Sequence, residues 1–145
     1  MPAPGLQYPN DSAALFDDGD EITCEAAAVI YGARFVRIAG NGTTDKPYVA
    51  LCGAGLSAFG VSTRDADPTG ATIIAAPTDV GVWHAPHKIV QVMAGAALTA
   101  GQLVMSDATG QAIPYVAGTG VVAVGTALHD AANATKADID RSQRT

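Results

Sequence analysis

Glycine and proline recur so often along this chain that long helices are excluded from most of it. The 145 residues include 16 glycines and 8 prolines, and both residue types mark turns and interrupt helices. Between them lie short apolar stretches, bounded by turn signals such as Asn41-Gly42 and Asp107-Ala-Thr-Gly110. The pattern predicts an all-β fold of short strands, arranged as a small barrel or sandwich. The expected strands are 22–24, 35–38, 48–52, 71–76, 80–84, 89–93, 102–105, 111–116, 121–124 and 137–140.

Length and composition predict one β domain, residues 21–145, with a thin core. A chain of this size buries roughly 70% of the surface that it exposes when unfolded. The apolar fraction is 48%, but much of it is alanine and valine, with only one tryptophan, three phenylalanines and four tyrosines as large anchors.

Residues 1–20 are expected to form an extended N-terminal arm, because they contain three prolines and an acidic cluster and show no sustained periodicity. The arm also carries apolar side chains without an obvious internal partner, so we expect them to dock on the body or to reach another subunit. These candidate contact residues are Leu6, Tyr8, Leu15 and Phe16.

The chain also matches itself when it is shifted by 65 to 69 residues, which predicts two degenerate repeat halves at about 26–66 and 95–131. Pro47-Tyr-Val-Ala50 recurs as Pro114-Tyr-Val-Ala117, and Gly60 with Asp65-Ala66 recurs as Gly125 with Asp130-Ala131. We expect the two copies to face each other across one barrel, because neither has enough large apolar residues for its own core. Gly53, Gly55, Gly118 and Gly120 fall in matching G-x-G segments and are predicted to form structural turns.

Three segments imitate sites of known chemistry, and each is better explained as structure. Gly53-Ala-Gly55-Leu-Ser-Ala58 resembles a dinucleotide-binding turn, but no helical stripe follows it to bind phosphate. His84 and His87 are two imidazoles flanking Pro86, and two ligands do not make a metal site. The acidic residues around Gly19 lack the spacing of a calcium loop. No nucleophile elbow is present, so we expect no catalytic residue, cofactor or metal.

The charge of the chain limits its possible partners, and its cysteines indicate a redox state. The net charge of −6 opposes binding to nucleic acid or to anionic membranes, and no apolar run is long enough to span a bilayer. The first residues lack the features of a signal peptide, so we expect synthesis in a cytoplasm. Cys24 and Cys52 are far apart without ligand-like spacing, which favours two buried free thiols.

Several motifs resemble the capsid decoration, or cement, proteins of tailed bacteriophages. They are Gly32-Ala-Arg-Phe-Val36, Ala58-Phe-Gly-Val61, Ala94-Gly-Ala-Ala-Leu-Thr-Ala-Gly-Gln-Leu-Val104, Ser106-Asp-Ala-Thr-Gly110 and Val124-Gly-Thr-Ala-Leu128. The resemblance covers most of residues 20–140. It implies a β-barrel or β-tulip body that is frequently trimeric and sits on the outer surface of the expanded head. The polar segment 138–145 departs from the apolar closing strand that the family implies. The sequence therefore does not decide whether the last strand forms there.

This resemblance implies a structural virion protein whose partner is the major capsid protein and which stabilises the capsid against internal DNA pressure. The arm would then lie along the capsid. A head-fibre base or a tail component would use the same β body. A carbohydrate- or small-molecule-binding module is the alternative from another class, with Trp83, Tyr31 and Tyr48 as its stacking candidates.

Overall fold

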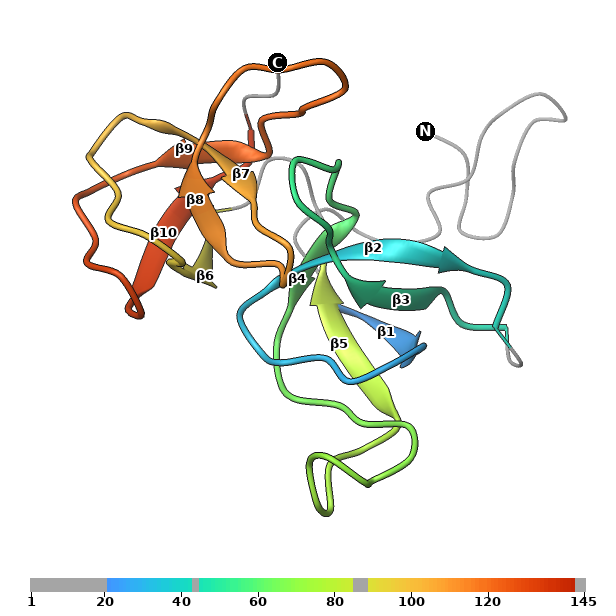
Figure 1. Cartoon of the computed structure of the whole chain (residues 1–145). Helices are drawn as coiled ribbons and strands as arrows, with labels where there is room; N and C mark the ends of the chain where they lie inside the picture. The colour runs from blue at the N-terminus through green and yellow to red at the C-terminus, as the bar shows by residue number, and fades with distance from the viewer. Residues whose placement is uncertain (1–20, 43–44, 85–88, 143–145) are drawn as a thin grey trace, which may run out of the picture.

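A computed structural model describes residues 21–42, 45–84 and 89–142 of the chain. These residues form ten strands and no helix, which confirms the all-β prediction. Figure 1 shows the strands in two neighbouring groups, β1 to β5 and β6 to β10. The strands are β1 (Glu21–Ala26), β2 (Phe35–Gly40), β3 (Tyr48–Leu51), β4 (Gly60–Ser62), β5 (Asp79–Trp83), β6 (Ile89–Met93), β7 (Leu103–Ser106), β8 (Ala112–Pro114), β9 (Gly125–Ala127) and β10 (Lys136–Asp140).

The first five strands close into a small barrel in the order β1-β3-β2-β4-β5. β1 pairs antiparallel with β5 from Glu21 opposite Trp83, and it pairs parallel with β3 at its other end. Alternate residues of β1 point inward, so Ile22, Cys24 and Ala26 are buried. The strand is therefore held at both edges while its apolar face fills the barrel.

The last five strands form a second sheet in the order β6-β10-β9-β7-β8. β10 lies inside this sheet, paired antiparallel with β6 on one side and β9 on the other. Its buried residues Ala137 and Ile139 alternate with the outward-facing Asp138 and Asp140. The polar C-terminal segment therefore does contain a closing strand, because only every second residue has to be apolar.

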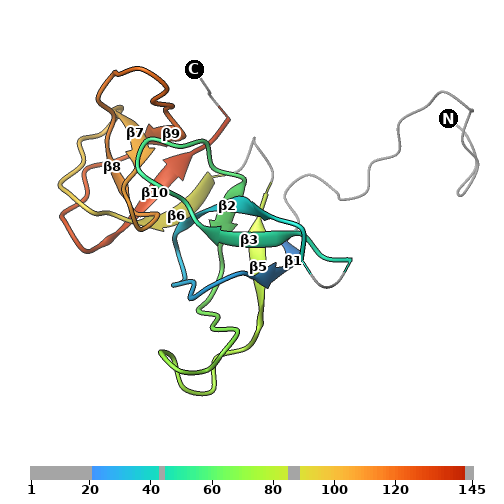
Figure 2. The ribbon, with the colours of Figure 1, turned by 45° about the vertical axis from the view of Figure 1, so that its right-hand side comes forward.

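The two sheets repeat one strand order. Read from β1 around the barrel, the order 1-5-4-2-3 is the order of β6, β10, β9, β7 and β8. Irregular contacts recur too, since an isolated bridge joins Ile30 to Ala66 in the first half and Leu98 to Ala131 in the second. The copies do not share one barrel as expected: each builds its own sheet, side by side in two views (Figure 2). The correspondence supports a duplication, and the limits 26–66 and 95–131 remain a prediction.

The identical tetrapeptides at 47–50 and 114–117 do not occupy equivalent places. Val36 lies opposite Leu51 in the barrel, and the corresponding Val104 lies opposite Pro114 in the second sheet. Leu51 therefore corresponds to Pro114, four residues away from the match that identity suggests. Backbone pairing fixes this register, whereas a short identical string does not.

Two predicted strands are wrong, and two observed strands, β4 and β9, lie outside the predicted ranges. Segment 71–76 is a loop, because the buried carboxylate of Asp67 accepts the backbone N–H groups of Thr72 and Ile73. Segment 121–124 is also irregular, and the strand begins only at Gly125. β4, only three residues long and opening with Gly60, escaped prediction because glycine disfavours strands.

The barrel and the second sheet share a core. One apolar cluster joins Phe35, Cys52, Ala58 and Val61 of the first half to ten buried residues of the second. Backbone hydrogen bonds cross the same boundary, including Met93 N–H to Ala33 O at 2.8 Å and Phe35 N–H to Gly110 O at 2.7 Å. The two halves are therefore one packed body.

Arg141 follows β10 and is buried in this boundary, with 2% of its surface exposed. Its Nη2 donates to Ala58 O at 3.0 Å, and its Nε donates to Val124 O at 3.3 Å. The guanidinium lies 6.0 Å from the centre of the Phe35 ring. A buried cation is tolerated where carbonyls and an aromatic face surround it, so Arg141 ties the C-terminal end of the second sheet to the barrel.

The turn before β8 should tolerate no side chain at Gly110. A Cβ there would lie 2.5 Å from Phe35 O, and the residue has a φ of +80°. Gly101 is a matched control, with a φ of +82° and no heavy atom within 4 Å of a Cβ. We expect Gly101→Ala to cost about 1 kcal/mol and Gly110→Ala at least about 2 kcal/mol more. Urea unfolding would measure both, and equal losses would contradict the role assigned to this turn.

The loop carboxylate of Asp67 should make stability depend on pH. Hydrogen bonds from Ile73 N–H, then from Thr72 and Thr69, hold the pKa of Asp67 well below its usual range. Its contribution is therefore present above the ordinary pKa of about 4 and is lost as pH falls below it. We expect Asp67→Asn to lower the thermal midpoint at pH 7, with the gap to wild type narrowing below pH about 4. The exposed Asp45→Asn control should show no such gap.

Candidate functional site

The sequence-predicted residues divide into two groups. Leu6, Tyr8, Leu15 and Phe16 lie outside the described residues. The four glycines Gly53, Gly55, Gly118 and Gly120 are described, and they lie in two similar turns. Gly53 O accepts the N–H of Leu56 at 3.2 Å, and Gly118 O accepts the N–H of Val121 at 3.2 Å.

The first of these turns lies at the boundary between the two halves. Gly55 has a φ of +68°, which glycine adopts without strain. Its N–H donates to Ser106 O at 2.9 Å, and its carbonyl accepts the N–H of Val122 at 2.9 Å. The backbone groups that would cradle a phosphate in a nucleotide site are thus already used, and no helix follows in the described residues.

Neither thiol is placed to act as a nucleophile. Cys24 and Cys52 are both free and fully buried, as predicted. Burial, and secondarily the nearby Asp79 carboxylate, raises the pKa of Cys24 to about 11. Burial also raises the pKa of Cys52. Because the thiolate is the reactive form, both side chains serve as core residues.

The described histidines make local contacts. The His84 ring stacks on Phe59 with centroids 4.2 Å apart, and its Nδ1 lies 2.8 Å from Phe59 O. His129 lies between Asp130 O and the Asp138 carboxylate, while His87 is outside the described residues. Within the described ranges, no three or more His, Cys, Asp or Glu side chains gather as metal ligands would.

The described residues also contain no helix that is long and apolar enough to cross a membrane.

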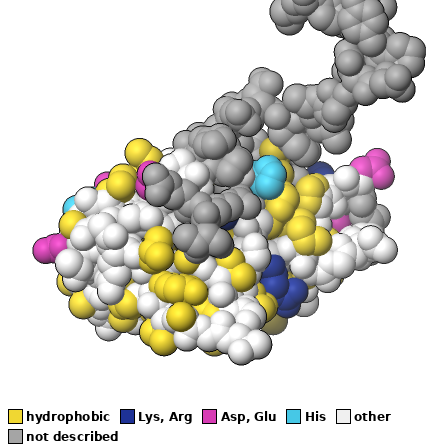
Figure 3. Space-filling model, turned by 90° about the horizontal axis from the view of Figure 1, so that it is seen from above, with side chains coloured by type: hydrophobic (Ala, Val, Ile, Leu, Met, Phe, Trp, Pro, Cys, Tyr) yellow, Lys and Arg dark blue, Asp and Glu magenta, His cyan; other side chains and the backbone are white. Residues whose placement is uncertain are grey.

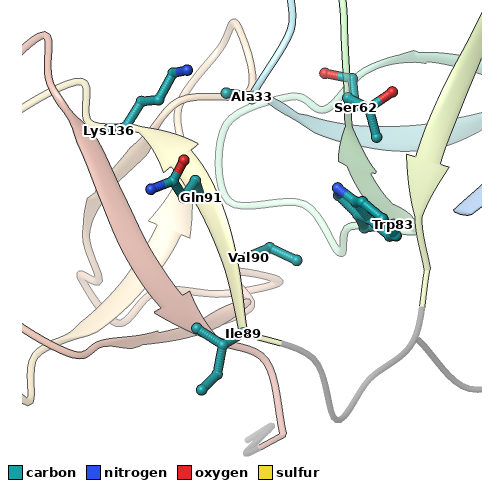
Figure 4. Close-up of a pocket in the computed structure, with 8 residues that line it drawn as sticks. Ala33, Ser62, Trp83, Ile89, Val90, Gln91 and Lys136 are labelled. Carbon is teal, nitrogen blue, oxygen red and sulfur yellow. The ribbon is translucent and has the colours of Figure 1, made fainter. Parts of the chain in front are cut away.

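A groove lies between the barrel and the second sheet. It consists of a hollow of about 320 Å³ and an adjoining hollow of about 370 Å³, which share Ala33, Thr63 and Lys136. Figure 4 shows Ser62 and Trp83 on one wall and the residues of β6 on the other. Sequence reasoning missed this site because it forms only where the halves meet. The hollow of about 320 Å³ is lined by Ala33, Ser62, Thr63, Trp83, Ile89, Val90, Gln91 and Lys136.

The groove does not have the lining of a carbohydrate site. Of the three stacking candidates, Trp83 alone is among the described lining residues. Tyr31 instead lies under the guanidinium of Arg34, 5.3 Å from its ring centre, and Tyr48 belongs to β3. A sugar-binding platform usually combines aromatic faces with convergent polar groups. The groove therefore gives no support to the hypothesis of a carbohydrate-binding module.

Several large apolar side chains are exposed on the surface instead. The most exposed is Ile74 at 88%, in the loop between β4 and β5. On the face in Figure 3, hydrophobic side chains lie scattered among uncharged ones, and charged groups are few. Apolar side chains scattered singly in this way are common on protein surfaces and do not by themselves mark a binding site. The other exposed large apolar side chains are Val116, Ile89, Ile38, Leu56, Leu128 and Tyr31.

The buried thiols give a direct check of the core. We expect neither Cys24 nor Cys52 to react with a disulfide reagent such as DTNB in the native protein at pH 8, because burial raises the pKa of each and blocks access. Both should react after unfolding in guanidinium chloride. Rapid reaction of either thiol in the native state would contradict the described packing.

Comparisons with known proteins agree with the fold and the sequence motifs. The family model described as "Phage cement protein" matches residues 15–142. Among solved structures, the N base of the head fiber gp8.5 of bacteriophage phi29 is similar, with a TM-score of 0.67 and 17% identity. That match covers 87% of this chain and 96% of the other, and at this identity it shows a shared fold. A search of the curated proteins found no match.

The family match spans both sheets and the shared core, so it rests on the whole described body and not on one motif. It agrees with the resemblance noted from the sequence. The chain therefore belongs to the phage cement protein family and is a structural component of the virion that associates with the capsid.

Proposed function

We propose that this protein binds the outer surface of the expanded capsid and stabilises it against the pressure of packaged DNA. The family match over residues 15–142 is the observation that carries the proposal. The major capsid protein is the partner, the protein is made in the host cytoplasm, and trimers are the assembled form. The proposal assigns the protein no catalytic step, cofactor or metal.

The arm makes the first contact with the shell in this proposal, through Leu6, Tyr8, Leu15 and Phe16. An extended segment with spaced apolar residues can add to a sheet edge or fill shallow pockets on a partner. The folded body adds exposed apolar side chains to this contact, on a surface whose face in Figure 3 carries few charged groups. Ile74, which is 88% exposed, is one apolar group available for such contacts.

Stabilisation follows from linkage and multiplicity. A protein that binds the expanded shell, but not its separated subunits, shifts the equilibrium toward the intact shell. Each contact can be weak, because many copies on one symmetric surface act together through effective concentration. The shared core joins the two sheets of the described residues into one body, so both can contribute contacts from each copy.

A head-fibre base is the second candidate, and the likeness to the phi29 head-fiber N base favours it. Such a base would also sit on the capsid, but its function would be to hold a further structure. Stabilisation of shells by this chain alone would separate the two functions, since a base need not strengthen the shell.

Co-sedimentation with expanded, undecorated capsids tests the proposal. We expect saturable binding of the full chain and regular external density on the imaged shells. Removing residues 1–20 should weaken binding at least about tenfold, or about 1.4 kcal/mol, while the described strands remain intact. Unexpanded shells are the matched control and should bind less.

Saturated shells should also resist heat or osmotic rupture better than bare shells. Full-length protein that fails to bind expanded shells would overturn the capsid proposal. Binding without any gain in rupture resistance would favour the head-fibre function instead.

A further inference from the structure

The groove between the two halves has one wall made by a sheet edge. β6 is an outer strand of the second sheet, paired with β10 along one side only. On its other side the described residues add one isolated bridge, from Ala94 to Ala112, just beyond the end of β6. The residues of β6 that line the groove, Ile89 to Gln91, have no strand partner on that side in the described part of the chain.

The direction of the backbone groups along this edge follows from one hydrogen bond. Met93 donates its N–H to Ala33 O at 2.8 Å, away from β10. Successive residues of a strand point their N–H and C=O groups to opposite sides, so those of Gln91 and Ile89 also point away from β10 and toward the groove. Two residues therefore offer a donor and an acceptor each to an added extended segment.

The groove offers a large apolar side chain on each of its walls, beside the polar Ser62 and Thr63. Trp83 is half-buried at the end of β5, and Ile89 is 60% exposed on β6. Figure 4 shows Val90 between these walls, with Ala33 near the far end. The groove thus combines an unpaired edge with apolar surface, the two features by which extended peptides are recognised.

The chain itself enters the structure at this groove. β1 begins at Glu21, which is paired with Trp83 of the groove wall. Twenty residues precede Glu21, and Phe16 is five residues upstream, a span of roughly 17 Å when extended. Leu15 and Phe16 are therefore within reach of the groove of their own chain.

Charge also favours this segment. Asp17, Asp18 and Asp20 follow Phe16 directly. The adjoining hollows are lined by Lys136 and Arg64 with a single carboxylate, Asp65. Lys136 and Arg64 offer two positive charges to such an acidic segment, beside the carboxylates of Asp65 and of Glu21, which lies opposite Trp83.

We propose that, in the free protein, residues 13–20 of the arm add as an extended segment to the edge of β6, with Leu15 and Phe16 against Trp83 and Ile89 of the same chain. Docking in this way would bury Leu15 and Phe16, two of the four arm side chains that the proposed function assigns to the capsid. The inference concerns the protein before it meets a shell, so it holds or fails independently of capsid binding.

Hydrogen exchange on the full-length chain tests the docking at single residues. We expect the amides of Ile89 and Gln91 to be protected in the wild type. The double variant Leu15→Ser/Phe16→Ser should speed their exchange at least about tenfold. The matched control Leu6→Ser/Tyr8→Ser changes the distal arm and should leave both rates unchanged. The amide of Val92, which points toward β10, is an internal reference and should be unaffected in both variants.

Trp83 is the only tryptophan in the chain and gives a second readout. Its emission should shift to longer wavelength in the Leu15→Ser/Phe16→Ser variant only, because docking shields the indole from water. Equal exchange at Ile89 and Gln91 in all three proteins would overturn the proposal. Protection that disappears on tenfold dilution would overturn the assignment to the same chain, because the arm would then belong to a second copy.

Discussion

The packing of the second sheet against the barrel depends on one side chain that crosses from the barrel into the core of the second sheet. Phe35 is the only fully buried aromatic residue among those described. It begins β2 of the barrel, yet it packs in the cluster that contains the buried residues of β6 to β10. Those residues are alanine, valine, leucine and isoleucine, which alone leave a small core. The second sheet therefore depends on the barrel for its largest core group.

Other contacts at the boundary follow from this arrangement. The turn at Gly110 has to approach the backbone of Phe35 closely, which only glycine permits at this position. Arg141 then covers the ring from the C-terminal end and uses carbonyls from both halves. The groove is lined from both halves, by Ser62 and Trp83 of the barrel and by Ile89 to Gln91 of β6.

Much of the fold could be predicted from alternation and turn residues. β5 and β6 show the apolar alternation or runs typical of strands, and both occur close to their predicted ranges. The failures have local physical causes. At 71–76 a side-chain carboxylate captured the backbone donors that a strand would use. At 121–124 the valines gave a strand signal, but Val122 donates its N–H to Gly55 of the other half. A single sequence does not reveal such distant partners.

The candidate site was less predictable than the fold. The two buried free thiols could be predicted from the spacing of Cys24 and Cys52. The groove could not, because Trp83, Ala33 and Lys136 are far apart in the chain and become neighbours only through the packing of the two sheets. The one sequence signal that could have pointed to it was the solitary tryptophan, since large aromatic groups are concentrated at interfaces.

The loop between β4 and β5 is where the two halves differ most in length. Residues 63–78 connect these strands, whereas residues 128–135 connect β9 to β10. The loop projects away from the second sheet in both ribbon views, and its base is fixed by Asp67. Two versions of one connection on the same architecture show that its length is not fixed by the fold. The tip near Ile74 is accordingly the place where a foreign peptide could be inserted and displayed in many copies on a particle.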